Sequence, residues 1–191
     1  PEKKYEELMK KHNVPNWYIE SCKKIKYMFP KAHAAAYVLS AIRVAWWKLY
    51  YPREYYAVYF STRCDFFDIE TLIQGKEMIF SRYSEILNMK QEGIKVSNKD
   101  EGLITVFEVA MEMYDRGYHF NNINLDLSES SVFIADPNDD NGILPPFTSV
   151  DGLGSAVGDS VVAARNKGTF LSKEDVIKRT KLNNSQIDFL S

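Results

Sequence analysis

Residues 150–191 read VDGLGSAVGDSVVAARNKGTFLSKEDVIKRTKLNNSQIDFLS, and the turn at their start decides how the second half of the chain is interpreted. Gly152-Leu153-Gly154 precedes a helical pattern with valines at positions 157, 161 and 162. Glycine lets the backbone bend tightly, and we expect Gly154 to need a positive φ. Leu153 would point into the core and hold the turn. The free N–H groups at the start of the next helix would face outward, where they favour phosphate oxygens.

A second turn of the same kind follows twenty-nine residues after Leu153. In Lys181-Leu182-Asn183, Leu182 takes the buried position and Asn183 stands where the second glycine would be. The two turns predict tandem helix-hairpin-helix motifs, which would contact both strands of a duplex without reading its sequence. The second turn lacks both glycines, Gly158 stands where alanine is usual, and little helix precedes the first turn. A plain connection between helices, with glycine for steric reasons, is the alternative.

The first half of the chain carries a basic segment, KIKYMFPKAHAAAY at residues 24–37. Lys31 and His33 fall in the first turn of a predicted helix, where positive side chains repel the positive end of the helix dipole. An anion such as a triphosphate would relieve that repulsion, and the alanines that follow leave a smooth face for its approach. An ordinary amphipathic helix with solvated lysines is the alternative.

The composition is that of a folded protein. The 191 residues are 45% hydrophobic, enough for a core and too much for a disordered chain. Residues 1–52 carry 10 Lys/Arg against 4 Asp/Glu, whereas residues 53–150 carry 8 against 17, so the basic charge that suits a polyanion lies at the beginning. The longest apolar run, near residues 32–42, is too short to span a membrane, and two cysteines are too few for a disulfide scaffold. We therefore expect a cytoplasmic protein without a membrane partner.

Helical patterns punctuated by proline fill the first ~90 residues. Trp17, Ile25 and Met28 stand at positions suited to burial. A long helix is expected from Pro30 to residue 50 or 51, with apolar residues at three-and-four spacing at positions 34, 38, 41, 45 and 49. Capping signals predict later helices that begin near Ser97, Ser172 and Asn183, and Gly117 is placed to end the first of these.

Between those later helices the pattern changes. Residues 123–127 alternate as a strand does, and residues 132–134 form a short apolar run before an acidic turn at 136–142. The sequence thus predicts a mainly α protein, with a helical domain over residues 1–95 and a small α+β region over residues 96–191. That second region would combine a short β ribbon, at about 121–145, with the helix-hairpin-helix motifs, at about 147–191.

The segment MFPKAHAAAY at residues 28–37, with its flanks from Tyr18 to Leu39, closely resembles the bacterial replicative DNA polymerase III alpha subunit of the PolC type. The resemblance covers nearly the whole chain. It continues at residues 55–57, 63, 112–118, 144–147, 152–154, 164–165 and 170–175, and it is looser at 70–105 and 128–142.

The resemblance implies a fragment from the carboxyl-terminal end of that enzyme, a DNA-directed DNA polymerase. Residues 1–95 resemble its fingers, which close over the incoming nucleoside triphosphate, and residues 96–191 resemble its duplex-binding region. By the same resemblance, Lys31 and His33 lie near the triphosphate, with Lys26 and Lys24 as further contributors. The residues expected to bind DNA are Gly152, Leu153, Gly154, Lys181 and Asn183.

The palm of such polymerases, whose aspartates hold two magnesium ions for phosphoryl transfer, has no counterpart in this sequence. We therefore expect no catalytic residue in the chain and no activity from the chain alone. Asp136, Asp139 and Asp140 superficially resemble a calcium loop, but the distal Glu of an EF-hand is missing, so no metal site is expected. The partners implied are primer–template duplex, the incoming dNTP, the palm, and a sliding clamp through a peptide that would follow Ser191. Both ends look cut, as in a fragment.

Two other classes of function stay open. A freestanding, non-catalytic helix-hairpin-helix module would use Gly152-Leu153-Gly154 in the same way. A helical protein-interaction domain would not bind nucleic acid at all, and a salt-dependent affinity for duplex DNA would exclude it. Palm sequence encoded upstream of Pro1 would favour the polymerase over the module.

Overall fold

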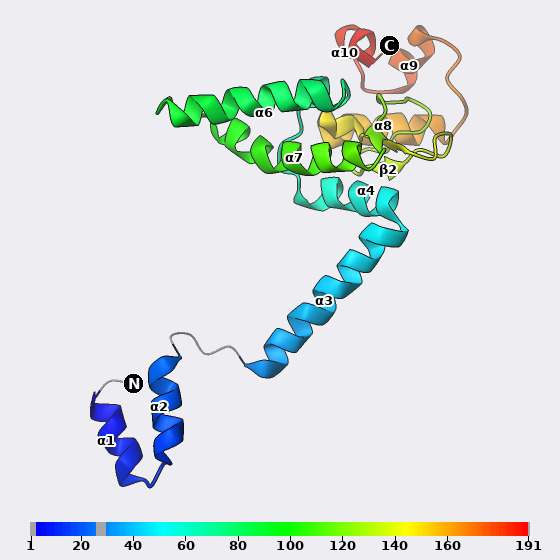
Figure 1. Cartoon of the computed structure of the whole chain (residues 1–191). Coiled ribbons are helices and arrows are strands. Elements are labelled where there is room, and N and C mark those ends of the chain that lie inside the picture. The colour runs from blue at the N-terminus through cyan, green and yellow to red at the C-terminus, as the bar shows by residue number, and fades with distance from the viewer. Residues whose placement is uncertain (1–2, 26–29, 191) are drawn as a thin grey trace. The chain divides into compact units, whose positions relative to one another are not determined.

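A computed structural model describes residues 3–25 and 30–190, and these form a mainly helical protein with a small sheet (Figure 1). By contacts the chain divides into two compact units, Pro1–Ala45 and Trp46–Ser191. The predicted fold class is therefore confirmed. The elements are, in order, α1 (Lys3–Lys11), α2 (Asn16–Lys24), α3 (Lys31–Tyr50), α4 (Pro52–Arg63), α5 (Ile69–Leu72), α6 (Lys76–Gln91), α7 (Asn98–Asp115), β1 (His119–Phe120), β2 (Ile134–Ala135), β3 (Gly142–Leu144), the 3-10 helix η1 (Phe147–Ser149), α8 (Ser155–Arg165), α9 (Lys173–Arg179) and α10 (Asn184–Leu190).

In the first unit α1 and α2 form a helical pair. Lys23 Nζ of α2 lies 2.9 Å from Glu6 Oε1 of α1. Hydrogen bonds from Lys10 and Lys23 lower the pKa of Glu6 to about 2. Ile19 is the buried side chain of α2, whereas Trp17 is 73% exposed. The expected burial of Trp17 is wrong because residues two apart on a helix face nearly opposite sides, so only one of them can face α1.

Two other side chains were expected to be buried in this part of the chain, and the one that the structure describes is exposed. Ile25 is 45% exposed, and Met28 lies outside the described residues. The long helix α3 is confirmed, but none of its side chains is buried, including the five apolar ones at three-and-four spacing. The three-and-four spacing therefore predicted the helix correctly but did not predict that its apolar side chains are exposed.

The second unit has its main core where α4, α6 and α7 pack together. Tyr56, Phe60, Ile79, Ile86 and Phe107 are almost completely buried there. The predicted ends of α7 are confirmed: Ser97 Oγ accepts the Asp100 N–H at 3.1 Å, and Gly117 ends the helix with a φ of +86°. This core holds α7 in place, and the first turn of α7 contacts the residues that follow η1.

A three-stranded sheet in the order β1-β3-β2 follows α7, with β1 parallel and β2 antiparallel to β3. The predicted short β ribbon is present as the β2–β3 pair. The strand expected at residues 123–127 is wrong, because Asn124 Oδ1 accepts the N–H groups of Asp126 and Leu127 at 2.8 and 3.2 Å. A side chain that takes backbone N–H groups locally forms a turn in place of a strand ladder.

The acidic loop between β2 and β3 is held by hydrogen bonds within the loop and by others from α4 and from the residues around β1. Arg53 of α4 donates to the carbonyl oxygens of Asp136 and Asp139 at 3.2 and 2.9 Å. The Asn141 N–H, the Asn121 amide and His119 Nε2 all contact the Asp139 carboxylate, and these contacts lower its pKa. The Asp139 carboxylate is thus engaged in hydrogen bonds that stabilise the loop.

The division near residue 95 concerns functional parts of a longer protein, and it stays a prediction. In the structure α6 and α7, on either side of that position, pack against each other. Across residues 3–25 and 30–190, no helix is both long and apolar enough to cross a membrane.

Candidate nucleic-acid interface

The first predicted hairpin, residues 150–154, connects η1 to α8. The Leu153 N–H donates to the Val150 carbonyl at 3.0 Å and closes a tight turn. Gly152 has a φ of +85°, whereas Gly154 has a φ of −76°. The expectation of a positive φ at Gly154 is therefore wrong: the left-handed residue stands inside the closed turn, and Gly154 is already the extended residue before α8.

Both hairpins share one apolar core, as the tandem motif requires. Leu153 and Leu182 are each only 4% exposed. They belong to one cluster with Phe147, Val150, Val161, Val176 and Ile187. Gln186 of α10 also donates to the Gly152 carbonyl at 3.4 Å, so the helix after the second hairpin contacts the first. The structure thus brings Leu153 inward, as predicted, and places the two turns side by side.

The start of α8 presents backbone N–H groups to the surface. Gly152, Gly154, Ser155 and Ala156 are all exposed. Within the described part of the chain, none of their four N–H groups has a hydrogen-bond acceptor. The first intrahelical bonds run from Val157 and Gly158 to the Gly154 carbonyl. These amides and the helix dipole together form a geometry that accepts an anion.

The second hairpin is different because its backbone is already hydrogen-bonded. The Lys181 N–H donates to Ser160 Oγ at 2.9 Å. Asn183 and Gln186 form a reciprocal capping box at the start of α10, with N–H to side-chain distances of 3.0 and 2.9 Å. The expected cap at Asn183 is confirmed. Lys181 and Asn183 remain predicted DNA-binding residues, and only their exposed side chains are available for that role.

Gly158 explains one departure from the usual motif. A Cβ at this position would lie 2.8 Å from Ser130 Oγ, 3.1 Å from Ser130 Cα and 3.2 Å from Phe147 Cβ. Phe147 and Thr148 donate their N–H groups to the carbonyls of Glu129 and Ser130. Glycine therefore lets α8 approach η1 and residues 129–130 closely, where alanine would push them apart.

Arg179 holds the connection between the two hairpins, and the sequence offered no signal for this role. Its guanidinium donates to the carbonyls of Ala164, Gly168 and Thr169 at 2.5, 2.6 and 2.9 Å. It also contacts the Asp175 carboxylate at 2.8 Å. An arginine in the last turn of a short helix is an ordinary capping residue in sequence, so these distant acceptors become visible only in the fold.

The basic segment lies where its helix was predicted. Lys31 and His33 occupy the first turn of α3, and Lys24 ends α2; all three are exposed. Lys26 lies outside the described residues. Over residues 3–25 and 30–190, no group of three or more His, Cys, Asp or Glu side chains is arranged to hold a metal ion. The assignments to nucleotide stay predictions.

Comparison with known proteins agrees with this geometry. The family profile described as "Helix-hairpin-helix motif" matches residues 117–191. The DNA polymerase III PolC-type of Bacillus subtilis strain 168 is 48% identical over 186 residues, which are 97% of this chain and 12% of that protein. The proteins of the same name from Oceanobacillus iheyensis and Listeria monocytogenes are 47% and 46% identical over 95% and 97% of the chain.

The chain spans only 12% of the length of each of these relatives. The matched helix-hairpin-helix residues include both hairpins and the whole of α8, α9 and α10. The chain is therefore a homologue of one segment of the PolC-type DNA polymerases III, and it contains a helix-hairpin-helix motif.

Proposed function

We propose that the chain acts as part of a replicative DNA polymerase, in which the hairpin at residues 150–154 binds the backbone of the primer–template duplex. The observation that carries the proposal is that the N–H groups of four exposed residues, Gly152, Gly154, Ser155 and Ala156, have no acceptor among the described residues. Such groups at the start of a helix bind phosphate oxygens, and phosphates are the same at every base pair. The hairpin would thus hold the duplex at any sequence.

The experiment that tests this function is fluorescence anisotropy with two unrelated duplexes at several salt concentrations. We expect equal affinity for both duplexes and a Kd of about 10⁻⁴ to 10⁻⁶ M, the range of non-specific binding. The affinity should fall as salt rises. A strong preference for one sequence would contradict the proposal, and so would the absence of binding at low salt.

Homology over nearly the whole chain to one part of much larger polymerases supports this reading over a freestanding helix-hairpin-helix module. The motif match speaks against a protein-interaction domain without a nucleic-acid role. We also propose that the protein works in the cytoplasm, and that a sliding clamp is reached through a peptide beyond Ser191.

For the first part of the chain we propose contact with the triphosphate of the incoming dNTP. Lys31 and His33 lie in the first turn of α3, where an anion would be stabilised by the helix dipole as well as by the side-chain charges. Lys24, and Lys26 by its position in the sequence, would add to the same positive field.

The prediction for Lys31 is made in the longer polymerase. Lys31→Ala should lower the efficiency of nucleotide use, because one charged contact to a phosphate is lost, and it should leave primer–template affinity nearly unchanged. Steady-state nucleotide incorporation and duplex binding measure the two quantities separately. Unchanged incorporation would make Lys31 an ordinary surface lysine.

We further propose that the metal ions and aspartates for phosphoryl transfer belong to a palm outside these 191 residues. The chain alone should therefore give no primer extension with magnesium and all four nucleotides. Positioning of substrates without metal-bound carboxylates does not supply the chemical step. Extension that co-purifies with the chain through repeated chromatography would contradict this prediction.

A further inference from the structure

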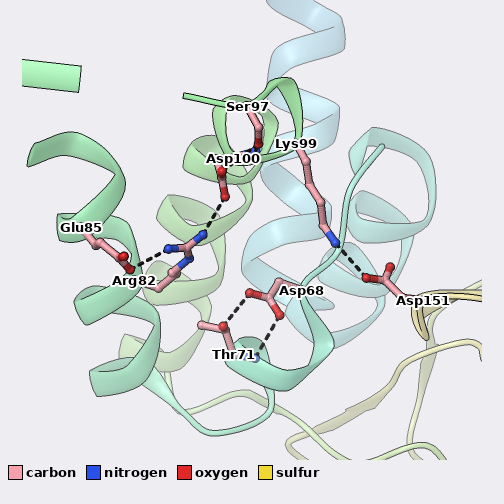
Figure 2. Close-up of polar contacts among 8 residues, drawn as sticks. All are labelled: Asp68, Thr71, Arg82, Glu85, Ser97, Lys99, Asp100 and Asp151. Carbon is pink, nitrogen blue, oxygen red and sulfur yellow. Dashed lines mark hydrogen bonds and ion pairs between the residues drawn. The ribbon is translucent and has the colours of Figure 1, made fainter. Parts of the chain in front are cut away.

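One side chain outside the helix-hairpin-helix match reaches the hairpin. Lys99 lies in the first turn of α7, and its Nζ is 2.9 Å from Oδ2 of Asp151, the residue just before Gly152 (Figure 2). The matched residues begin at position 117, so Lys99 is not part of the motif. The fold thus places a lysine against the residue that directly precedes the hairpin glycines.

The other carboxylates near Lys99 are engaged elsewhere. Asp68 caps α5 by accepting from the N–H and the hydroxyl of Thr71 at 3.3 and 2.6 Å. Asp100 accepts from Arg82 at 2.8 Å and from the Ser97 hydroxyl at 2.7 Å (Figure 2). In the described part of the chain, Asp151 is therefore the direct ionic partner of Lys99.

Lys99 keeps its charge in this surrounding. The hydrogen bond to Asp151 makes the largest contribution to raising the pKa of its ammonium. The charges of Asp151, Asp68 and Asp100 act in the same direction. The group is thus a cation at physiological pH, as an ionic contact with phosphate requires.

The pair is open to solvent on both sides. The side chains of Lys99 and Asp151 are 45% and 88% exposed. Two hollows of about 580 and about 420 Å³ adjoin the pair, and Lys99 and Asp151 line both. An ion pair so exposed contributes little to stability, and its ammonium has room to turn toward another acceptor.

Attachment of the hairpin does not depend on this pair. Val150 and Leu153 are buried in one apolar cluster with Ile69 of α5. Non-polar packing therefore already fixes the turn against α5. The role of the Lys99–Asp151 pair is then to be sought in its charges and not in attachment of the turn. A carboxylate one residue before the free amides repels a phosphate that binds them, unless a cation compensates it.

We propose that Lys99 is a phosphate ligand of the duplex-binding surface, held by Asp151 in the free protein and transferred to a backbone phosphate when the hairpin meets a duplex. The proposal rests on the proposed function of the hairpin and adds a residue from α7 to it. Asp151, left without its partner, is almost fully exposed and returns to water. The exchange replaces one exposed charge-assisted contact by another and adds an ionic contact to the complex. The repulsion between Asp151 and the phosphate remains, but it is weakened by water because Asp151 is 88% exposed.

The test compares Lys99→Met with Lys90→Met in the whole chain, with short duplex DNA as the probe. Lys90 forms a similar exposed pair, 3.2 Å from Glu101 Oε1, with side chains 43% and 52% exposed. It lies near the end of α6, and within the described residues its ionic partner is Glu101 and not a residue of the hairpin. Lys99→Met should weaken binding roughly threefold to fivefold and reduce the slope of log K against log salt by about 0.9. Lys90→Met should change neither quantity appreciably.

Asp151→Asn provides the complementary change, because it frees the ammonium and removes the repelling carboxylate. It should strengthen binding and leave the salt slope as in the parent, since the number of phosphates contacted is unchanged. Both outcomes together support the exchange of partners.

Three results would overturn the proposal. A parent-like affinity and slope in Lys99→Met would show that the ammonium does not touch phosphate. If a hairpin variant loses binding in the same assay, the proposed function of the hairpin still holds. A weaker affinity with an unchanged slope and a lower Tm would make Lys99 a structural residue. A parent chain that binds no duplex would remove both this proposal and the proposed function.

Discussion

Gly152→Val should lower the affinity of the chain for duplex DNA roughly tenfold or more. Gly152 has a φ of +85°, a conformation that a β-branched residue tolerates badly. A Cβ there meets nothing within 4 Å, so the cost comes from the backbone alone. The strained turn should open, and the N–H groups of Gly152 and Gly154 would lose the arrangement that we propose for phosphate binding. Anisotropy with the same two duplexes measures the loss.

Gly117→Val is the matched control for this variant. Gly117 has nearly the same backbone angle, +86°, and equally open space, but it ends α7 at the opposite end of that helix from Lys99. Both variants should lose a similar amount of stability, about 1 to 3 kcal/mol, and only Gly152→Val should lose duplex affinity beyond its unfolded fraction. Equal affinities in the two variants would mean that the turn does not contact DNA.

Arg179→Met should lower the free energy of unfolding of the second unit by roughly 2 to 4 kcal/mol. The guanidinium donates to three carbonyls and one carboxylate, and it lies 4.8 Å from the centre of the Phe170 ring. Methionine keeps much of the apolar stem but removes all of these hydrogen bonds. The carbonyls of Gly168 and Thr169 lose the donor that the structure gives them, whereas Ala164 and Asp175 keep the N–H groups of Lys167 and Leu171. The connection between α8 and α9 should then loosen, and the second hairpin should lose its position.

Urea unfolding followed by circular dichroism measures this effect, with Arg63→Met as the control. Arg63 is an exposed arginine at the end of α4 in the same unit, so its replacement should change the unfolding free energy by less than about 0.5 kcal/mol. A similar small change in Arg179→Met would show that the contacts of its guanidinium do not stabilise the fold.

Local signals in the sequence predicted much of the helical framework. The caps at Ser97 and Ser172, the terminator Gly117 and the capping box at Asn183 act over three or four residues, so a single sequence contains all that they need. The inward positions of Leu153 and Leu182 follow from the same short turns.

The errors arose where a choice depends on groups that the pattern does not include. Alternating residues at 123–127 suggested a strand, but the side chain of Asn124 took the backbone donors. The two glycines of the hairpin look equivalent in sequence, and only the closed turn shows that Gly152 has the positive φ. Trp17 and Ile19 both suit burial, and the packing of α1 decided between them.

The candidate site could be predicted only as far as its local part. Gly152-Leu153-Gly154 predicts the hairpin from three adjacent residues. Lys99, by contrast, lies 52 positions before Asp151 and contacts it only because of how α7 packs. The same holds for Arg179, whose acceptors belong to residues up to 15 positions away. Contacts of this kind are consequences of tertiary structure, and no spacing rule in one sequence announces them.

The central claim is that the exposed amides at the start of α8 bind a backbone phosphate. The most direct measurement is a ¹H–¹⁵N NMR titration of the labelled chain with a short duplex at low salt. We expect the amide signals of Gly152, Gly154, Ser155 and Ala156 to move together and to saturate at the Kd found by anisotropy. Signals that move elsewhere while these four stay unchanged would contradict the account.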